Sequence, residues 1–224
     1  MLFINNVVER KTMKYKNIVW DWNGTLLNDL EVGVNTLNDM LGRRQLLPMT
    51  VNEYKSYFEF PVIRFYEKVG FDMNQENFHE LSVDFVETYD KYAKDVTLNK
   101  DVPEVLEMLQ CSGFSQFVLS ALREDLLVQM IRDFSIDSRF DKICGSDNIY
   151  ADGKIGRGRE MLKNLSIEPS ETLMIGDTVH DHEVAEALGF DCILFAGGHN
   201  DEQRLLEKAP VIYSLKELIK LLEK

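Results

Sequence analysis

The sequence has little of three features that would narrow its class directly: cysteine, long apolar runs and positive charge. The three cysteines, Cys111, Cys144 and Cys192, lack the number and spacing of a metal or redox site, so we assign them no chemistry and expect them to be small buried hydrophobes. No stretch approaches the roughly eighteen apolar residues that cross a bilayer, and the N-terminus lacks a signal core and cleavage site. We therefore expect a cytoplasmic protein.

Positive charge is scarce, with 25 Lys and Arg against 38 Asp and Glu, a net charge of −13. Such a surface repels polyanions, which argues against nucleic acid and membrane partners. A small phosphorylated metabolite can still bind where positive charge is local, and we expect a monomer or homodimer.

Met13 precedes a compact first strand, so residues 1–12 are expected to be an upstream start or a loosely ordered arm.

Short runs rich in branched and aromatic residues alternate with helical patterns over most of the chain. Six of these runs read as strands: 17–22, 115–120, 140–145, 172–176, 191–195 and 211–214. Between them lie amphipathic patterns at 124–134, 160–165 and 182–189. This alternation predicts an α/β fold, a mainly parallel sheet with helices on both faces.

Residues 30–98 break that rhythm, because helical patterns follow one another without a convincing strand. The last pattern, over 75–94, carries an apolar stripe expected to be core rather than a ligand site (Phe78, Leu81, Phe85, Tyr89, Tyr92). It also carries an acidic stripe expected to be solvated (Glu76, Glu80, Asp84, Glu87). We therefore predict an inserted helical domain at 30–98, with the α/β core formed by 14–29 and 99–224.

Polar residues stand where the predicted parallel strands end, which is where such sheets bind ligands. Asp21 ends the first strand, Ser120 the second, and Asp177 follows "TLMIG", with Asp181 four residues later. Lys154 lies in the glycine-flanked loop "DGKIGRGR". Three carboxylates cannot crowd together without a neutralising cation, and Mg²⁺ prefers such oxygen ligands. Ser120 and Lys154 could then contact phosphate oxygens.

These motifs resemble those of the haloacid dehalogenase superfamily: "DWNGT", "VLS", a lysine and "IGDTVHD". Lys163 is a second candidate for the lysine. The inserted helices resemble the cap of the phosphoglycolate phosphatase and β-phosphoglucomutase branch. The resemblance implies a Rossmann-like core with a helical cap and a Mg²⁺-dependent phosphatase that acts on a small phosphomonoester.

The resemblance also implies a role for each motif residue. Asp21 would attack phosphorus and form an aspartyl phosphate, while Asp21, the Asn23 carbonyl, Asp177 and Asp181 would serve the metal. Ser120 and Lys154 would stabilise the transferring group. Gly24 would allow a sharp turn that Thr25 stabilises beside the phosphate.

Asn23 departs from the pattern, which has an aspartate there that protonates the leaving group and later activates water. Losing a general acid and base costs about 10² to 10⁴ in rate. Four interpretations stay open: a slow phosphatase, a substitute base from His180 or His182, a phosphate-ester binding or regulatory protein without turnover, and an asparagine produced by the preparation or altered by deamidation before Gly24.

Other classes fit less well. A receiver domain is shorter and lacks the inserted helices, and the metal-free dehalogenase branch lacks the equivalent of Asp177. The phosphonoacetaldehyde hydrolase branch needs a cap lysine, for which nothing singles out Lys55 or Lys68. In the cap, "FEFPVIRFYEKVG" (58–70) is the expected specificity segment, with Arg64 as its charged substrate contact or, alternatively, as a solvated helix arginine. "AGGHN" (196–200) is expected to approach the same rim closely through Gly197 and Gly198.

Overall fold

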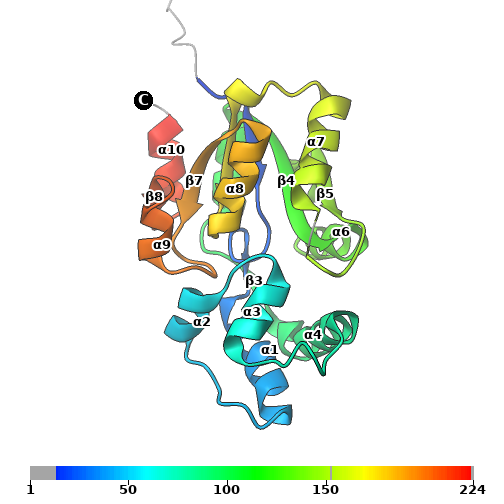
Figure 1. Ribbon diagram of the computed structural model, residues 1–224. Coiled ribbons are helices and arrows are strands. Elements are labelled where there is room, and N and C mark those ends of the chain that lie inside the picture. The colour runs from blue at the N-terminus through cyan, green and yellow to red at the C-terminus, as the bar shows by residue number, and fades with distance from the viewer. Residues whose placement is uncertain (1–13, 152, 223–224) are drawn as a thin grey trace, which may run out of the picture.

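The computed structural model describes residues 14–151 and 153–222, so the expectation for residues 1–12 lies outside it. Its main sheet has six strands, all parallel to their neighbours (Figure 1). In spatial order they are β5 (Lys142–Ser146), β4 (Ser115–Arg123), β1 (Asn17–Trp20), β6 (Thr172–Gly176), β7 (Asp191–Phe195) and β8 (Val211–Ile212). The predicted parallel sheet is confirmed, with β4 three residues longer than expected.

Alternating side chains of the central strands supply two separate cores. Ile18 and Trp20 of β1 join one apolar cluster and Val19 joins the other, as the period of two along a strand requires. The first cluster is covered by α5 (Val102–Cys111), α6 (Glu124–Asp133) and α10 (Lys216–Leu222), and the second by α7 (Lys154–Leu165) and α8 (Val179–Leu188). The fold is therefore the Rossmann-like α/β arrangement expected. The sequence patterns missed α5, α10 and the short α9 (Glu202–Leu206).

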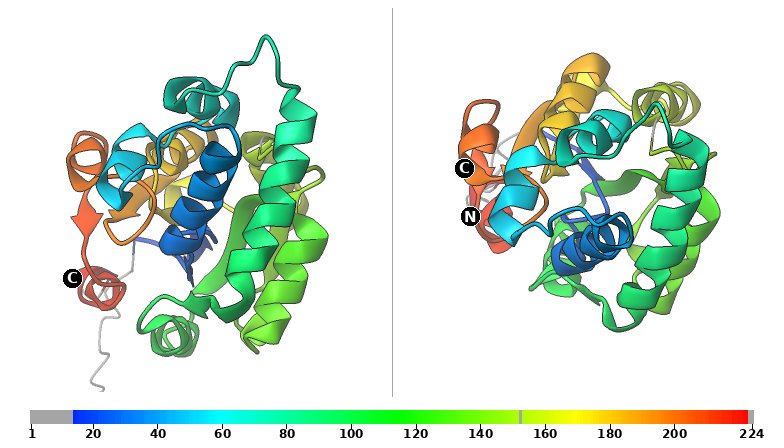
Figure 2. Two further views of the ribbon diagram at one scale, coloured as in Figure 1. Left: turned by 90° about the horizontal axis from the view of Figure 1, so that it is seen from below. Right: turned by 60° about the horizontal axis from the view of Figure 1, so that its bottom comes forward.

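Four helices form a third group with its own apolar cluster, below the sheet in Figure 1 and in front of it in the view from below (Figure 2). They are α1 (Leu30–Arg43), α2 (Val51–Tyr57), α3 (Val62–Val69) and α4 (Phe78–Tyr92). A two-stranded antiparallel ribbon that sequence reasoning missed, β2 (Leu27–Asn28) with β3 (Thr97–Leu98), lies where this group joins the core. The domain division at 29/30 and 98/99 stays a prediction. One-turn 3₁₀ helices span Ala93–Asp95, Asp137–Arg139 and Pro169–Glu171.

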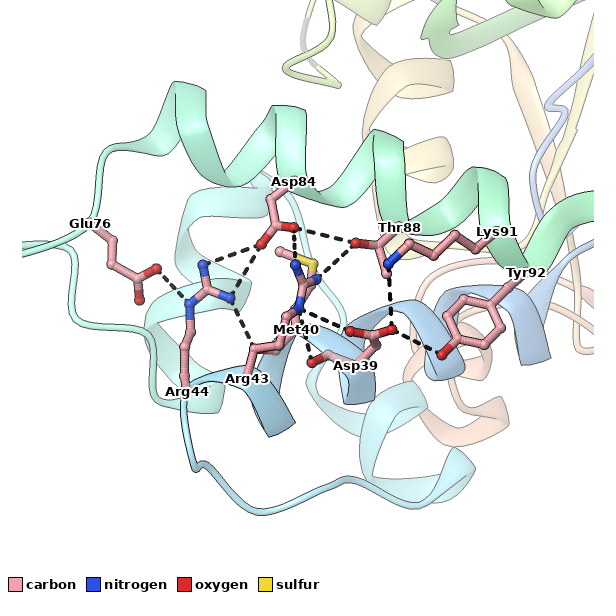
Figure 3. Close-up of polar contacts among 9 residues, drawn as sticks. All are labelled: Asp39, Met40, Arg43, Arg44, Glu76, Asp84, Thr88, Lys91 and Tyr92. Atoms are coloured by element: carbon pink, nitrogen blue, oxygen red, sulfur yellow. Dashed lines mark hydrogen bonds and ion pairs between the residues drawn. The ribbon is translucent and has the colours of Figure 1, made fainter.

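Ion pairs tie the C-terminal end of α1 to α4 and to the segment just before α4 (Figure 3). Arg43 Nη1 lies 2.6 Å from Asp84 Oδ1, and Arg44 Nε lies 2.6 Å from Glu76 Oε2. Glu80 and Glu87 are exposed. The acidic stripe is thus solvated only in part, because Asp84 and Glu76 form ion pairs within the group of four helices.

The apolar stripe of α4 also differs from expectation. Leu81 is buried in the cap cluster, and Phe78 and Phe85 pack against that cluster as expected. However, Phe78, Phe85 and Tyr89 also line a cavity, and Tyr92 is 40 % exposed. Cys144 is buried while Cys111 is exposed, so the expectation of buried thiols is wrong for Cys111. Within the described residues no helix is both long and apolar enough to span a membrane.

Candidate active site

Adjacent parallel strands bring the sequence-predicted carboxylates together. Asp21 follows β1 and Asp177 follows β6, and the two strands pair in parallel, so their ends reach the same edge. With Asp181 near the start of α8, the three residues each offer an oxygen within 4.8 Å of the others, and all three are buried. The sheet topology therefore builds a compact acidic cluster.

Lys154 is the buried cation of this cluster. Its Nζ lies 2.6 Å from Asp21 Oδ1 and 2.6 Å from Asp181 Oδ1, and the residue is 3 % exposed. It is the first residue of α7 rather than a loop residue, because the helix begins directly after Gly153, whose φ is 77°. Lys163, the other candidate, is exposed near the far end of the same helix.

Asp181 also fixes the start of α8. Thr178 and Asp181 form a reciprocal capping box, and Asp181 Oδ2 accepts hydrogen bonds from Thr178 N, Thr178 Oγ1 and Asp177 N at 3.0, 2.7 and 3.1 Å. Because these bonds engage Oδ2, the other oxygen, Oδ1, faces Lys154. The N-terminal capping box of α8 therefore positions Asp181 within the cluster.

The turn after β1 packs directly on Asp177. Thr25 is fully buried, its hydroxyl donates to Asp177 Oδ1 at 2.9 Å, and it does not line the cavity. A Cβ on Gly24 (φ 75°) would lie 2.3 Å from Asp177 Oδ2, and one on Gly198 would lie 2.1 Å from it. The close approach expected of the "AGGHN" loop is confirmed for Gly198, whereas Gly197 lies against the ring of Phe195. Thr25 is placed to position a carboxylate rather than to touch substrate.

Ser120 lies inside β4, not at its end, because the strand continues to Arg123 through a register shift after Leu119. The residue is 1 % exposed and lines the same cavity as Asp21 and Lys154. Its hydroxyl oxygen accepts from Leu122 N at 3.1 Å, which leaves the hydroxyl hydrogen able to donate to a ligand.

The cluster holds excess negative charge. Burial raises the pKa of Asp21 well above its usual range, with the nearby Asp181 and Asp177 adding to the rise and Lys154 opposing it. Burial likewise raises the pKa of Asp177 to about 6, against the lowering effect of His199. Burial disfavours the charged form of Lys154, but Asp181 and Asp21 outweigh it and raise its pKa.

A divalent cation fits this donor set. Three buried carboxylates face one ammonium group, and hard oxygen ligands suit Mg²⁺ in particular. Asp21 and Asp177 would hold the ion, and its charge would favour their ionised forms, against the burial that raises their pKa values.

Replacing Asp177 by asparagine should therefore stabilise the protein when Mg²⁺ is absent. The folded-state pKa of about 6 lies above the unfolded value, so the wild type loses stability as pH rises from about 4 through 6, by roughly 3 kcal/mol for this group. In EDTA at pH 7, D177N should melt several degrees higher than the wild type, and the gap should vanish at pH 4. Added Mg²⁺ should raise the melting temperature of the wild type only. Equal shifts in both proteins would contradict this metal site.

Asn23 is held by a buried carboxylate that sequence reasoning missed. Asp29 is 1 % exposed, and its Oδ2 accepts from Asn23 Nδ2 at 2.7 Å and from the Tyr89 hydroxyl at 2.8 Å. Its Oδ1 accepts from Gly24 N at 2.7 Å. Both groups that deamidation would join, the Asn23 amide and the Gly24 nitrogen, are thus engaged, which argues against that interpretation of Asn23.

His199 completes this network beneath the cluster. Its Nε2 lies 3.1 Å from Asp29 Oδ1, its Nδ1 lies 3.1 Å from the Tyr54 hydroxyl, and its backbone N donates to Asp177 Oδ2 at 2.6 Å. Burial would lower the pKa of His199, but Asp29 and Asp177 raise it to about 9. His199 is therefore an imidazolium at neutral pH, paired with Asp29.

Of the remaining candidate residues, one histidine lines the cavity and the others do not. His180 lines it and stacks on Phe60, with ring centroids 4.5 Å apart, and burial and then Lys154 lower its pKa, so its ring is neutral. His182 lines a separate hollow beside Phe190.

Arg64 is exposed and does not line the cavity, because Val62, Phe65 and Tyr66 form the inward face of α3. Lys55 and Lys68 do not line it either, which weakens the Schiff-base alternative.

Comparison with known proteins agrees with this geometry. The sequence pattern of the haloacid dehalogenase-like hydrolases matches residues 18–195. The chain is 25 % identical over 210 residues to a 5'-nucleotidase from Pseudomonas aeruginosa, covering 90 % of this chain and 91 % of that protein. It is 28 % identical over 193 residues to phosphoglycolate phosphatase from Aquifex aeolicus, covering 81 % and 85 %.

Solved structures support the fold. A predicted phosphatase from Clostridium acetobutylicum superposes with a TM-score of 0.76 at 22 % identity, covering 94 % of this chain and 99 % of that one. A haloacid dehalogenase-like hydrolase from Streptococcus pneumoniae gives 0.67 at 19 % identity, covering 93 % and 98 %. With the family match spanning most of the sequence, the chain belongs to the haloacid dehalogenase-like hydrolases, as an enzyme of their phosphatase type.

Proposed function

We propose that the protein hydrolyses a small phosphate monoester in a Mg²⁺-dependent reaction through an aspartyl phosphate on Asp21. The observation that carries this proposal is the buried cluster of Asp21, Asp177 and Asp181 around Lys154, with Ser120 on the same cavity. Positioning and electrostatic stabilisation are the main demands of phosphoryl transfer, and this cluster supplies both. The cytoplasmic location and the monomeric or dimeric state stay predictions of the sequence.

Each residue has a defined part in this proposal. Asp21 attacks phosphorus, while Lys154 and Ser120 donate hydrogen bonds to the oxygens of the transferring group. When bound by Asp21, Asp177 and the Asn23 carbonyl, Mg²⁺ supplies charge that draws the phosphate oxygens to the carboxylates. Asp181 orients Lys154 at 2.6 Å, and Thr25 orients Asp177 at 2.9 Å.

The side chain of Asn23 takes no proton. It donates to Asp29 and has no ionisable group, so neither departure of the alcohol nor attack of water is assisted from this position. Of the two histidines proposed as substitutes, His180 is on the cavity and His182 is not. The proposal is thus a phosphatase whose second step, hydrolysis of the aspartyl phosphate, is slow.

A panel assay tests this function against the alternative of a binding or regulatory protein. The full-length chain is incubated with acetyl phosphate, phosphoglycolate, glycerol phosphate and phenyl phosphate, with Mg²⁺ and with EDTA, and inorganic phosphate is measured. We expect Mg²⁺-dependent release from at least one substrate. Tight phosphate-ester binding without release from any of them would favour the non-catalytic alternative and overturn ours.

A further inference from the structure

The cavity over the carboxylate cluster is lined by two unlike sets of side chains. Its volume is about 450 Å³, in the range of small-molecule sites, and Asp21, Ser120 and Lys154 form the polar set. The other set consists largely of apolar side chains from α3, α4, α6 and the segments beside them; those that matter below are Phe58, Phe60, Phe65, Phe85, Tyr89 and Met130, here called the aromatic wall. A leaving group attached to a phosphate at Lys154 would face this wall.

Neighbouring rings hold the aromatic wall in place. Phe58 and Phe65 pack edge to face at 5.2 Å, and Phe85 and Tyr89 lie 5.9 Å apart. The Tyr89 hydroxyl donates to Asp29, which turns the body of its ring into lining. The wall is thus preformed, and an aromatic ligand would gain ring contacts there without ordering flexible side chains.

Away from the carboxylate cluster, the cavity has few cationic side chains that could bind a second anionic group of the substrate. Away from the carboxylate cluster, the lysine and arginine side chains that line the described part of the cavity are Lys94, which is exposed, and Arg123. Arg123 is engaged with Asp125, through Nε at 2.6 Å and Nη2 at 2.9 Å. His199 is a buried cation that also lines the cavity, but its two ring nitrogens are engaged by Asp29 and by the Tyr54 hydroxyl. A leaving group with its own carboxylate would therefore be desolvated against aromatic rings without a buried cation that is free to pair with it.

Asn23 sets a second and independent demand on the leaving group. Without an acid at this position, the departing oxygen leaves as an anion. This is far easier for a phenol, whose pKa is about 10, than for an alkyl alcohol, whose pKa is near the value of about 15.7 for water. We propose that the site is selective for phosphate monoesters of aromatic alcohols, with the ring held against the aromatic wall; this rests on the proposed function.

The reaction needs no proton from an acidic side chain of the enzyme. An Asp21 oxygen forms a bond to phosphorus as the bond from phosphorus to the aryl oxygen breaks, and the aryloxide departs with that electron pair and takes a proton from solvent. Water then attacks phosphorus, its proton passes to solvent, and phosphate leaves with the Asp21 carboxylate restored.

Substrate comparison tests this selectivity. With the full-length protein and Mg²⁺, kcat/KM for 1-naphthyl phosphate should exceed that for phosphoglycolate by about 100-fold or more. Acetyl phosphate serves as the reference, because its leaving group needs no protonation and has no ring. Turnover of acetyl phosphate with phosphoglycolate preferred over naphthyl phosphate would overturn the selectivity alone, whereas no Mg²⁺-dependent turnover of any of the three would overturn the proposed function.

Two variants on one helix test the aromatic wall. Phe85→Leu removes a lining ring, while Tyr92→Leu removes a ring of α4 that is 40 % exposed and outside the cavity. The ratio of kcat/KM for naphthyl phosphate to that for acetyl phosphate should fall about five- to tenfold in F85L and stay unchanged in Y92L. This ratio does not depend on the fraction of protein that is folded. An unchanged ratio in F85L would contradict the proposal.

Discussion

Replacing Asp21 by asparagine should lower Mg²⁺-dependent turnover by a factor of about 10⁴ or more, because an amide cannot supply the attacking oxygen anion. The fold should survive the change. Lys154 keeps Asp181 Oδ1 at 2.6 Å, and the variant removes a buried carboxylate whose pKa burial raises well above its usual range. The measurement is phosphate release from acetyl phosphate alongside a thermal melt.

Asp181→Asn is the matched comparison, since it removes a carboxylate from the same cluster but leaves the attacking group. It should reduce turnover less than D21N does. If D21N kept more than a few per cent of wild-type turnover with its melting temperature intact, Asp21 would not be the nucleophile.

Replacing Asn23 by aspartate should raise turnover of alkyl phosphates by about 10² or more, because it supplies the missing acid and base. The structure also predicts the state of the new carboxyl. Asn23 Nδ2 lies 2.7 Å from Asp29 Oδ2, and two carboxylates at that distance share a proton. His199 lowers the pKa of Asp29 against the opposing effect of burial, so the proton should reside on the new residue, ready for transfer.

Steady-state kinetics with glycerol phosphate and acetyl phosphate measure this gain. It should be larger for glycerol phosphate, whose leaving group needs the proton more. Rates that N23D leaves unchanged for both esters would mean that the acid and base lie elsewhere, and loss of activity in His180→Gln would then identify the histidine that lines the cavity.

The sequence predicted those parts of the site that follow from strand ends. Asp21 and Asp177 could be placed together because β1 and β6 are buried runs that pair in parallel, and the ends of parallel strands meet. Lys154 was predicted in the right neighbourhood but in a loop, because the glycines around it hide the start of α7. Periodicity also predicted consecutive helices over 30–98, and the last pattern, over 75–94, contains α4 within three residues at either end.

The rest depends on tertiary contacts that carry no local signal. Asp29 and His199 are 170 positions apart and meet only because the ribbon of β2 and β3 and the loop after β7 reach the same edge. Tyr89 looked like core because helical spacing cannot distinguish a side chain that faces a neighbouring helix from one that faces a cavity. Of the two alternatives for Arg64, the solvated helix arginine agrees with its exposed position on α3, two residues from the inward Val62.

Quantifying the aspartyl phosphate tests the central claim most directly. The wild type is mixed with excess acetyl phosphate and Mg²⁺, quenched in acid on the millisecond scale, and the peptide containing Asp21 is analysed by mass spectrometry. Because Asn23 cannot activate water, we predict that a phosphoryl group accumulates on Asp21 toward one per molecule before steady state, and that it is absent in EDTA. Mg²⁺-dependent turnover without phosphorylated Asp21 at any time would contradict the account.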